Sequence, residues 1–384
     1  MDNTACSFHS HKNTPSAWII ATDLAPFPVP FSEWVTSVEF YWSPLAKRPR
    51  VTQQFEEARQ TAARLLGAHS REIIFTANST QAINVVCGGL KKPLRVLTTT
   101  LEHHSNLLPW TSHGQVEFVP WNREGVLDLN SFHRQLDQSP DLVAIAHASN
   151  FLGTFHPIDE IVSACRARNI PVLVDASQSI AYVSLNVRTL GCDYLVFSGH
   201  KVYGPSGVGV LYVRNEIIDA MAPVLLGGSM VKEVHARSFV PNDVPYRFEA
   251  GTPNIEGAIA LGSALRYFLG LGYESVAAHE QGLTRYAKDV LSKVPHRNLL
   301  GPPAGRPSAP LATFYVKGLE SGAIAKALGN RANVVVRSGF HCAQPAHEHL
   351  ALGPTVRASF AIYNTRAEID AMVETLHALA RFCH

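Results

Sequence analysis

The sequence has no strong excess of charge of either sign and no long apolar run. Its 384 residues contain 33 Lys and Arg against 31 Asp and Glu, and no basic run is longer than the short stretch Lys47–Arg50. Such a sequence lacks the basic patch that follows a phosphate backbone. It also lacks the apolar stretch of about 18 residues that would span a membrane, and its start, Met1–His11, has no apolar signal-peptide region. We therefore expect no nucleic-acid or membrane partner and a soluble, cytoplasmic protein.

Paired cysteines are missing as well. The six cysteines form no Cys-x-x-Cys pair, and their spacing fits neither a disulfide framework nor a zinc site. Any cysteine with a chemical role is therefore expected to be a free thiol, with no metal involved. The six are Cys6, Cys87, Cys165, Cys192, Cys342 and Cys383.

Apolar strand-like runs alternate with amphipathic stretches from about residue 54 onward. This order is typical of an α/β domain built around a mostly parallel sheet. Seven such runs within about 145 residues predict one wide sheet. The strand candidates are Glu72–Thr76, Arg95–Thr99, Val116–Val119, Leu142–Ala146, Pro171–Val174, Tyr194–Phe197 and Val208–Val213.

Changes in composition divide the chain into three expected parts. Residues 1–53 hold several Pro, Trp and Phe residues without a clear period and are expected to form an N-terminal arm or flap. Residues 54–270 form the expected large domain, and residues 271–384 a smaller C-terminal α/β domain. The small domain is expected to contain strands near Leu311–Val316, Val334–Val336 and Val356–Phe360 and a last helix from Ala367 to about Phe382.

A lysine and an aspartate follow or end two of the predicted strands. Lys201 lies between an apolar strand and a glycine-rich turn, where desolvation lowers the pKa of an amine and permits Schiff-base chemistry. Asp175 ends the preceding strand, so both side chains should point into one crevice. This pair suits pyridoxal phosphate, which needs an amine for its aldehyde and a carboxylate at its ring nitrogen. Ser79 and Thr80 offer hydroxyls and backbone N–H groups at a helix start, which is where a phosphate binds.

Several motifs together resemble the class V, fold-type I pyridoxal-phosphate enzymes, and most closely the cysteine desulfurase and selenocysteine lyase group. The resemblance runs from about residue 54 to the end and implies a fold-type I transferase. The motifs are Glu102–Trp110, Ser149–Thr154, Asp175–Gln178, Ser198–Pro205, Phe248–Pro253, Arg337–Pro345 and Val356–Phe360.

The resemblance implies a role for each residue of the expected cofactor site. Lys201 would hold the cofactor aldehyde, Asp175 the pyridinium nitrogen and Gln178 the phenolic oxygen. His103 would stack on the ring and exchange a proton with the substrate, and Asn150 would lie beside the cofactor oxygen. The phosphate would be held by Ser79, Thr80, Ser198 and His200, with Thr252 reaching in from a second subunit, so that the resemblance also implies a homodimer.

The resemblance further implies the substrate contacts and the reaction. Arg357 would bind the substrate carboxylate, a task that suits its planar guanidinium. Arg337 would also bind the substrate. Cys342, whose thiolate the neighbouring His341 and Arg337 would favour, would attack the substrate sulfur. The expected function is a cysteine desulfurase that converts L-cysteine to L-alanine, leaves a persulfide on Cys342 and passes the sulfur to an acceptor protein.

Four alternatives stay open at this point. On the same scaffold the chain could be a selenocysteine lyase, a cysteine or cystine C–S lyase, or another class V enzyme such as an epimerase or an aminotransferase. From a different class, it could be a non-catalytic pyridoxal-phosphate-binding partner protein. Among these, only Cys342 favours the desulfurase, whereas Lys201 and Arg357 serve every enzyme of the group.

Overall fold

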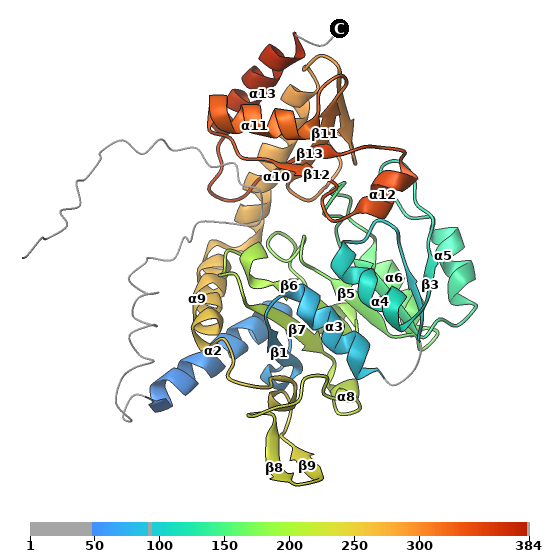
Figure 1. The fold of residues 1–384 in the computed structure, drawn as a ribbon, viewed down its shortest axis with the longest axis vertical. Coiled ribbons are helices and arrows are strands. Elements are labelled where there is room, and N and C mark those ends of the chain that lie inside the picture. The colour runs from blue at the N-terminus through green and yellow to red at the C-terminus, as the bar shows by residue number, and fades with distance from the viewer. Residues whose placement is uncertain (1–47, 91–93, 382–384) are drawn as a thin grey trace, which may run out of the picture.

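The computed structural model describes residues 48–90 and 94–381 as a large and a small sheet surrounded by helices, with an additional two-stranded hairpin (Figure 1). The arm expected over residues 1–53 lies outside this part up to residue 47, and residues 48–53 are helical. The helices are α2 (Arg48–Leu66), α3 (Ser79–Gly89), α4 (Leu108–His113), α5 (Leu129–Leu136), α6 (Ile158–Arg166), α7 (Val187–Leu190), α8 (Asn215–Ile218), α9 (Ile255–Leu271), α10 (Tyr273–Leu291), α11 (Ser321–Ala332), α12 (Gln344–His349) and α13 (Arg366–Ala380). The strands are β1 (Ile73–Thr76), β2 (Leu94–Thr98), β3 (Gly114–Phe118), β4 (Leu142–Ala146), β5 (Val172–Asp175), β6 (Tyr194–Ser198), β7 (Gly209–Val213), β8 (Val231–His235), β9 (Ser238–Pro241), β10 (Arg297–Leu300), β11 (Leu311–Val316), β12 (Arg337–Gly339) and β13 (Thr355–Ser359).

The large sheet has seven strands in the order β1-β7-β6-β5-β4-β2-β3. Only β7 is antiparallel to its neighbours, so the predicted mostly parallel sheet is confirmed. Strands β4, β5 and β6 are buried along their whole length, which explains their continuous apolar sequences. The carboxyl ends of the parallel strands meet at one edge of the sheet, and the residues that follow them are therefore brought together there.

Helices α2 and α9 pack side by side against one end of this sheet (Figure 1). Their backbones approach closely where Gly262 faces Ala58, since a Cβ atom on Gly262 would lie 2.6 Å from the Ala58 Cβ. The glycine in the middle of an apolar helix is thus required by packing, although glycine lowers intrinsic helix stability.

The small sheet has the order β10-β11-β13-β12 and packs against α10, α11 and α13. The strand expected over Val334–Val336 is wrong by about three residues, because ladder pairing begins only at Arg337, which faces Arg357 on β13. The last helix ends at Ala380, and Phe382 lies outside the described residues. Helix α10 links the large and small sheets, as Figure 1 shows, while the domain boundary expected at residue 270 stays a prediction.

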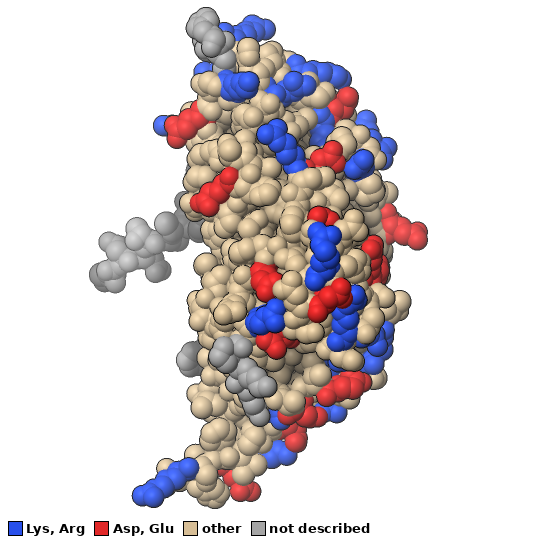
Figure 2. All heavy atoms as spheres, turned by 90° about the vertical axis from the view of Figure 1, so that its right-hand side faces the viewer, with Lys and Arg blue, Asp and Glu red and all other residues tan. Residues whose placement is uncertain are grey.

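The surface carries mixed charge. Figure 2 shows basic and acidic side chains intermixed over most of one face, in keeping with the net charge of +2. No helix within the described ranges is both long and apolar enough to cross a membrane. The hairpin β8–β9 protrudes from the large sheet (Figure 1), and its exposed apolar side chains include Val234 and Phe239.

A buried ion pair joins α2 to the segment before α9. The guanidinium of Arg59 is 1% exposed and donates to both carboxylate oxygens of Glu249, at 2.6 and 2.9 Å, and to the carbonyl oxygen of Ile73 at 2.9 Å. Glu249 also accepts from the backbone N–H of Phe75. The pair thereby connects α2, β1 and the chain that leads into α9.

We predict that Arg59→Met lowers the free energy of unfolding by about 3–5 kcal/mol, because the carboxylate of Glu249 would remain buried without its cation. The change can be measured by urea unfolding followed by circular dichroism. Arg71→Met is the matched control, since Arg71 and Asp219 form an exposed pair at 3.3 Å, and it should cost less than about 1 kcal/mol. Equal losses in the two variants would contradict the structural role given to Arg59.

Candidate active site

A cavity of about 210 Å³ lies at the carboxyl edge of the large sheet and extends to the small sheet. Eleven of the thirteen predicted site residues line it. They are Ser79, Thr80, His103, Asn150, Asp175, Gln178, Ser198, His200, Lys201, Arg337 and Arg357. The structure therefore brings together residues from most of the predicted motifs, while their individual roles stay predictions.

A carboxylate and an amine from neighbouring parallel strands form the base of this cavity. Asp175 is the last residue of β5, and Lys201 lies in the short turn after β6. Burial raises the pKa of Asp175, whereas a hydrogen bond from the backbone N–H of Ser177, 2.9 Å long, and the charge of Lys201 lower it. The charge of Lys201 also reaches the ring of His103. The cavity thus holds a buried acid and a cation in electrostatic contact.

One end of the cavity is formed by the start of α3. Asn78 caps this helix by accepting from the backbone N–H of Gln81, and the backbone N–H of Ser79 donates to the Ser198 hydroxyl at 2.9 Å. Thr80 shares a hydrogen bond with Ser105. Hydroxyls gathered at the positive end of an eleven-residue helix make a favourable position for an anion.

His103 forms one wall and is held as a neutral imidazole. Its Nδ1 accepts from the backbone N–H of Ser105 at 3.1 Å, so in the neutral ring Nε2 carries the proton. Burial, followed by the nearby charge of Lys201, lowers the pKa of His103 to about 4. At neutral pH the residue can therefore donate a hydrogen bond from Nε2.

Two arginines form the opposite wall. Arg337 on β12 and Arg357 on β13 face each other across the antiparallel pair, and Arg357 is 2% exposed. The guanidinium of Arg357 donates to the carbonyl oxygen of Asn150 at 2.6 Å. These cations give the small-sheet side of the cavity a positive charge that suits a carboxylate.

Cys342 is not among the residues that line the cavity, but it contacts the lining residue Arg337 from a tightly held loop. A guanidinium nitrogen of Arg337 lies 2.9 Å from Sγ and donates a hydrogen bond to it. His341 and Cys342 both have left-handed backbone conformations, with φ of 52° and 55°. Their carbonyl oxygens accept from the Asn150 side chain at 2.7 Å and from the His104 backbone N–H at 2.8 Å.

Thr252 and three further cysteines of the described part of the chain lie away from the cavity. Thr252 lines a separate hollow near Phe75 and Asn254. Its expected contact with the active site of a second subunit stays a prediction. Cys87, Cys165 and Cys192 are buried within the hydrophobic cores. Cys6 and Cys383 lie outside the described residues.

Two buried acids near the site were missed by the sequence analysis. Glu102, next to His103, accepts from the Asn106 side chain and the backbone N–H of Ala146, and burial raises its pKa to about 8. Its place in the motif Glu102–Trp110 was the available signal. No sequence motif pointed to Glu280 on α10, because its partner Tyr203 lies 77 positions away in the sequence.

Glu280 and Tyr203 connect three parts of the chain behind Lys201. The Tyr203 hydroxyl donates to Glu280 Oε1 at 2.5 Å and accepts from the backbone N–H of Ile362, after β13, at 3.4 Å. A small cavity of about 60 Å³ is lined by Glu280, Tyr203, Lys201 and groups from both sheets. The other oxygen of Glu280 is buried there without a hydrogen-bond partner among the described residues.

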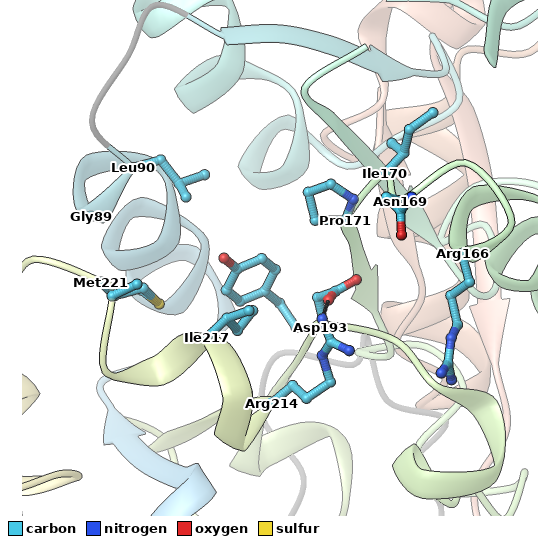
Figure 3. Close-up of a pocket in the computed structure, with 12 residues that line it drawn as sticks. Gly89, Leu90, Arg166, Asn169, Ile170, Pro171, Asp193, Arg214, Ile217 and Met221 are labelled. Carbon is cyan, nitrogen blue, oxygen red and sulfur yellow. Dashed lines mark ion pairs between the residues drawn. The ribbon is translucent and has the colours of Figure 1, made fainter. Parts of the chain in front are cut away.

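A larger hollow of about 490 Å³ lies at the opposite edge of the sheet, where β5 and β6 begin (Figure 3). Asp193 and Arg214 face each other in it as an ion pair at 2.7 Å. None of the predicted site residues lines this hollow. The candidate active site is therefore the smaller cavity at the carboxyl edge.

Comparison with known proteins identifies the class. The sequence matches the model of the aminotransferase class-V family over residues 45–372, so the chain belongs to this family. The resemblance derived from the motifs is thereby confirmed, and so is the fold-type I architecture that it implies.

Within the family, the chain is similar to proteins described as cysteine desulfurases. It is 39% identical over 345 residues to a probable cysteine desulfurase of Synechocystis sp., covering 87% of this chain and 82% of that protein. A probable cysteine desulfurase of Mycolicibacterium paratuberculosis is longer; it is 40% identical over 342 residues, which are 86% of this chain and 50% of that one. The apo structure of a cysteine desulfurase from Thermococcus onnurineus NA1 superposes with a TM-score of 0.88 at 33% identity, covering 95% of this chain and 94% of that one.

We predict that Glu280→Gln becomes more stable relative to the unmodified protein as the pH rises from about 5.5 to 8.5. Burial raises the pKa of Glu280 from 4.5 to about 8, so between these values the folded protein binds a proton that the unfolded chain releases. The free energy of unfolding of the unmodified protein therefore falls as the pH rises through this range. The glutamine side chain of the variant has no proton to lose and does not cause this decrease.

The measurement is urea unfolding at the two pH values. Glu274→Gln is the control, because Glu274 is an exposed carboxylate on the same helix, and it should leave the difference between the two pH values unchanged. The same pH response in both variants would show that Glu280 is not the buried acid described above.

Proposed function

We propose that this protein is a pyridoxal-phosphate-dependent cysteine desulfurase. The observation that carries the proposal is the contact of the Cys342 thiol with Arg337, which lines a cavity together with Lys201, Asp175 and Arg357. The similarity to cysteine desulfurases over most of the chain supports it. An acceptor protein for the sulfur belongs to the same proposal.

The cavity has the donors and acceptors that pyridoxal phosphate requires. Lys201 offers an amine for the aldehyde, Asp175 a buried carboxylate for the ring nitrogen, and the start of α3 a site for the phosphate. The hydroxyl of Ser177, which is buried in the cavity wall and helps to lower the pKa of Asp175, forms no well-aligned hydrogen bond with the described residues, so a polar ligand there would satisfy it. When bound, the cofactor withdraws electrons from the Cα atom of an amino acid.

Different residues of the chain would then bind the substrate and transfer protons. Arg357 would bind the substrate carboxylate, since its guanidinium lies on the cavity wall and is fixed by Asn150. The Lys201 amine would take the Cα proton as a general base. His103, neutral with a proton on Nε2, would donate to or accept from the substrate thiol.

The Cys342 thiolate would carry out the sulfur transfer. Its Sγ attacks the sulfur of L-cysteine, the carbon–sulfur bond breaks, and the electron pair of that bond stays with the carbon. Protonation of this carbon gives L-alanine, and the transferred sulfur remains on Cys342 as a persulfide. The Asn150 and His104 contacts hold the cysteine loop in place during this step.

A homodimer is part of the proposal. Thr252 lies outside the cavity of its own chain, near the exposed start of α9. In a dimer it would reach the phosphate end of the neighbour's cavity. Sedimentation of the purified protein measures the oligomeric state directly.

The deciding experiment is the identification of the product. The purified protein with cofactor is mixed with L-cysteine, cystine or selenocysteine, and alanine and pyruvate are quantified. Alanine from cysteine supports the desulfurase, whereas pyruvate indicates β-elimination by a C–S lyase. Turnover of selenocysteine alone would make the protein a selenocysteine lyase.

Lys201→Ala is expected to lower alanine formation at least about a hundredfold, because the general base is lost. Borohydride treatment of the unmodified protein, followed by peptide mass analysis, should find the cofactor attached to Lys201. Lys326→Ala, on an exposed position of α11, is the control and should retain full activity. Attachment of the cofactor to any other lysine would refute the assignment.

For Cys342→Ala we expect binding of L-cysteine to remain and alanine release to fall to a small fraction, because Arg357 and Lys201 are intact while the thiol is absent. Peptide mass analysis of the unmodified protein, treated with L-cysteine without reductant, should show one added sulfur on Cys342. The other five cysteines in the same digest serve as the internal control. A variant that released alanine at the unmodified rate would rule out the persulfide mechanism.

A further inference from the structure

A second polar cavity lies between α10 and the loop that joins β10 to β11. Its volume is about 70 Å³, and it contains none of the active-site residues. Four of its residues occupy positions i, i+3, i+4 and i+7 of α10 and so share one side of this helix, and the loop supplies the others. The lining residues are Gln281, Thr284, Arg285, Lys288, Ala304, Gly305, Arg306, Pro307 and Ser308.

Lys288 is the unusual residue of this cavity. It is 4% exposed, and its ammonium donates to the carbonyl oxygen of Pro302 and to the Ser308 hydroxyl, both at 2.9 Å. An ammonium has three N–H donors, so one remains. Within residues 48–90 and 94–381, Lys288 forms no ion pair. A buried charge without a counter-ion is costly, which indicates that an anion belongs beside it.

Two further cations border the same cavity. Arg285 is exposed one turn before Lys288 on α10, and Arg306 comes from the loop. Arg306 pairs with the exposed carboxylate of Glu124 at 3.1 Å. No Asp or Glu is among the described residues that line the cavity. Three cations and one neighbouring carboxylate leave a net positive charge.

We propose that this cavity binds a small tetrahedral oxyanion, either inorganic phosphate or the phosphate group of a monoester. The Lys288 ammonium would donate its third N–H to the anion, with Arg285 and Arg306 at the rim. A cavity of about 70 Å³ accommodates one such group but no larger molecule in full, so the remainder of a monoester would extend into solvent. The site is separate from the proposed catalytic reaction and does not depend on it.

Anion binding at this place would stabilise the contact between the two sheets. Ser308 precedes Ala309, whose backbone N–H donates to the carbonyl oxygen of Gly153 at 2.8 Å. Gly153 belongs to the loop that also contains Asn150, a residue of the candidate active site. An anion that orders the Pro302–Ser308 segment would therefore support the loop that holds Arg357 and the cysteine loop.

The test is calorimetric titration of the cofactor-saturated protein with inorganic phosphate and with glycerol phosphate, so that the phosphate position at α3 is already filled. Both titrations are repeated with Lys288→Met and with Lys293→Met. Lys293 is the matched control, because it is an exposed lysine just after α10 that pairs with Asp289. We expect Lys288→Met to weaken binding at least about tenfold and Lys293→Met to leave it unchanged.

Preference for inorganic phosphate or for the monoester would identify the source of the oxyanion, and either supports the site. Absence of binding, or equal binding by Lys288→Met, would overturn the proposal. A second measurement needs no variant: phosphate should slow the acylation of Lys288 by acetic anhydride, followed by peptide mass analysis, and should not protect Lys293. Failure of phosphate to protect Lys288 would also overturn the proposal.

Discussion

The carboxylate of Asp175 and the charge of Lys201, held at the ends of two buried parallel strands, determine the rest of the active site. Burial raises the pKa of Asp175, and the positive charge of Lys201 partly offsets this effect. A ligand that enters must satisfy both. The carboxyl ends of parallel strands lie at one edge of the sheet. The same edge holds the start of α3 and the hydroxyls of Ser79 and Ser198.

The two sheets contribute different chemistry to the cavity, and Asn150 joins them. The large sheet supplies the amine, the acid and the anion position, whereas the small sheet supplies two arginines and the thiol. The Asn150 side chain donates to the His341 carbonyl oxygen, and its own carbonyl accepts from Arg357. Asn150, in the loop after β4, therefore contacts both the substrate-binding arginine and the cysteine loop. This shared contact fixes the position of the thiol relative to the group that would bind the substrate carboxylate.

The sequence allowed the buried strands and most of the cavity to be predicted, because continuous apolar runs and the polar residues after them are local features. Strand β12 was misplaced since its three residues, Arg337–Gly339, have no apolar pattern. The hairpin β8–β9 was missed because its side chains are mostly exposed and its sequence is mixed. The Glu280–Tyr203 contact depends on tertiary packing alone. The role of Thr252 needs a second chain, which no pattern in one sequence describes.

Three of the buried ionisable groups, Glu102, Glu280 and Lys288, differ in what they require. Burial brings the pKa of Glu102, Glu280 and Lys288 to about 8 in each case. At neutral pH this value leaves both acids protonated and uncharged, so neither needs a counter-ion, and each accepts a hydrogen bond from a neutral side chain, Asn106 or Tyr203. The same value leaves the lysine protonated and charged. Lys288 alone among these three therefore needs an opposite charge, which its neutral partners Pro302 and Ser308 do not provide.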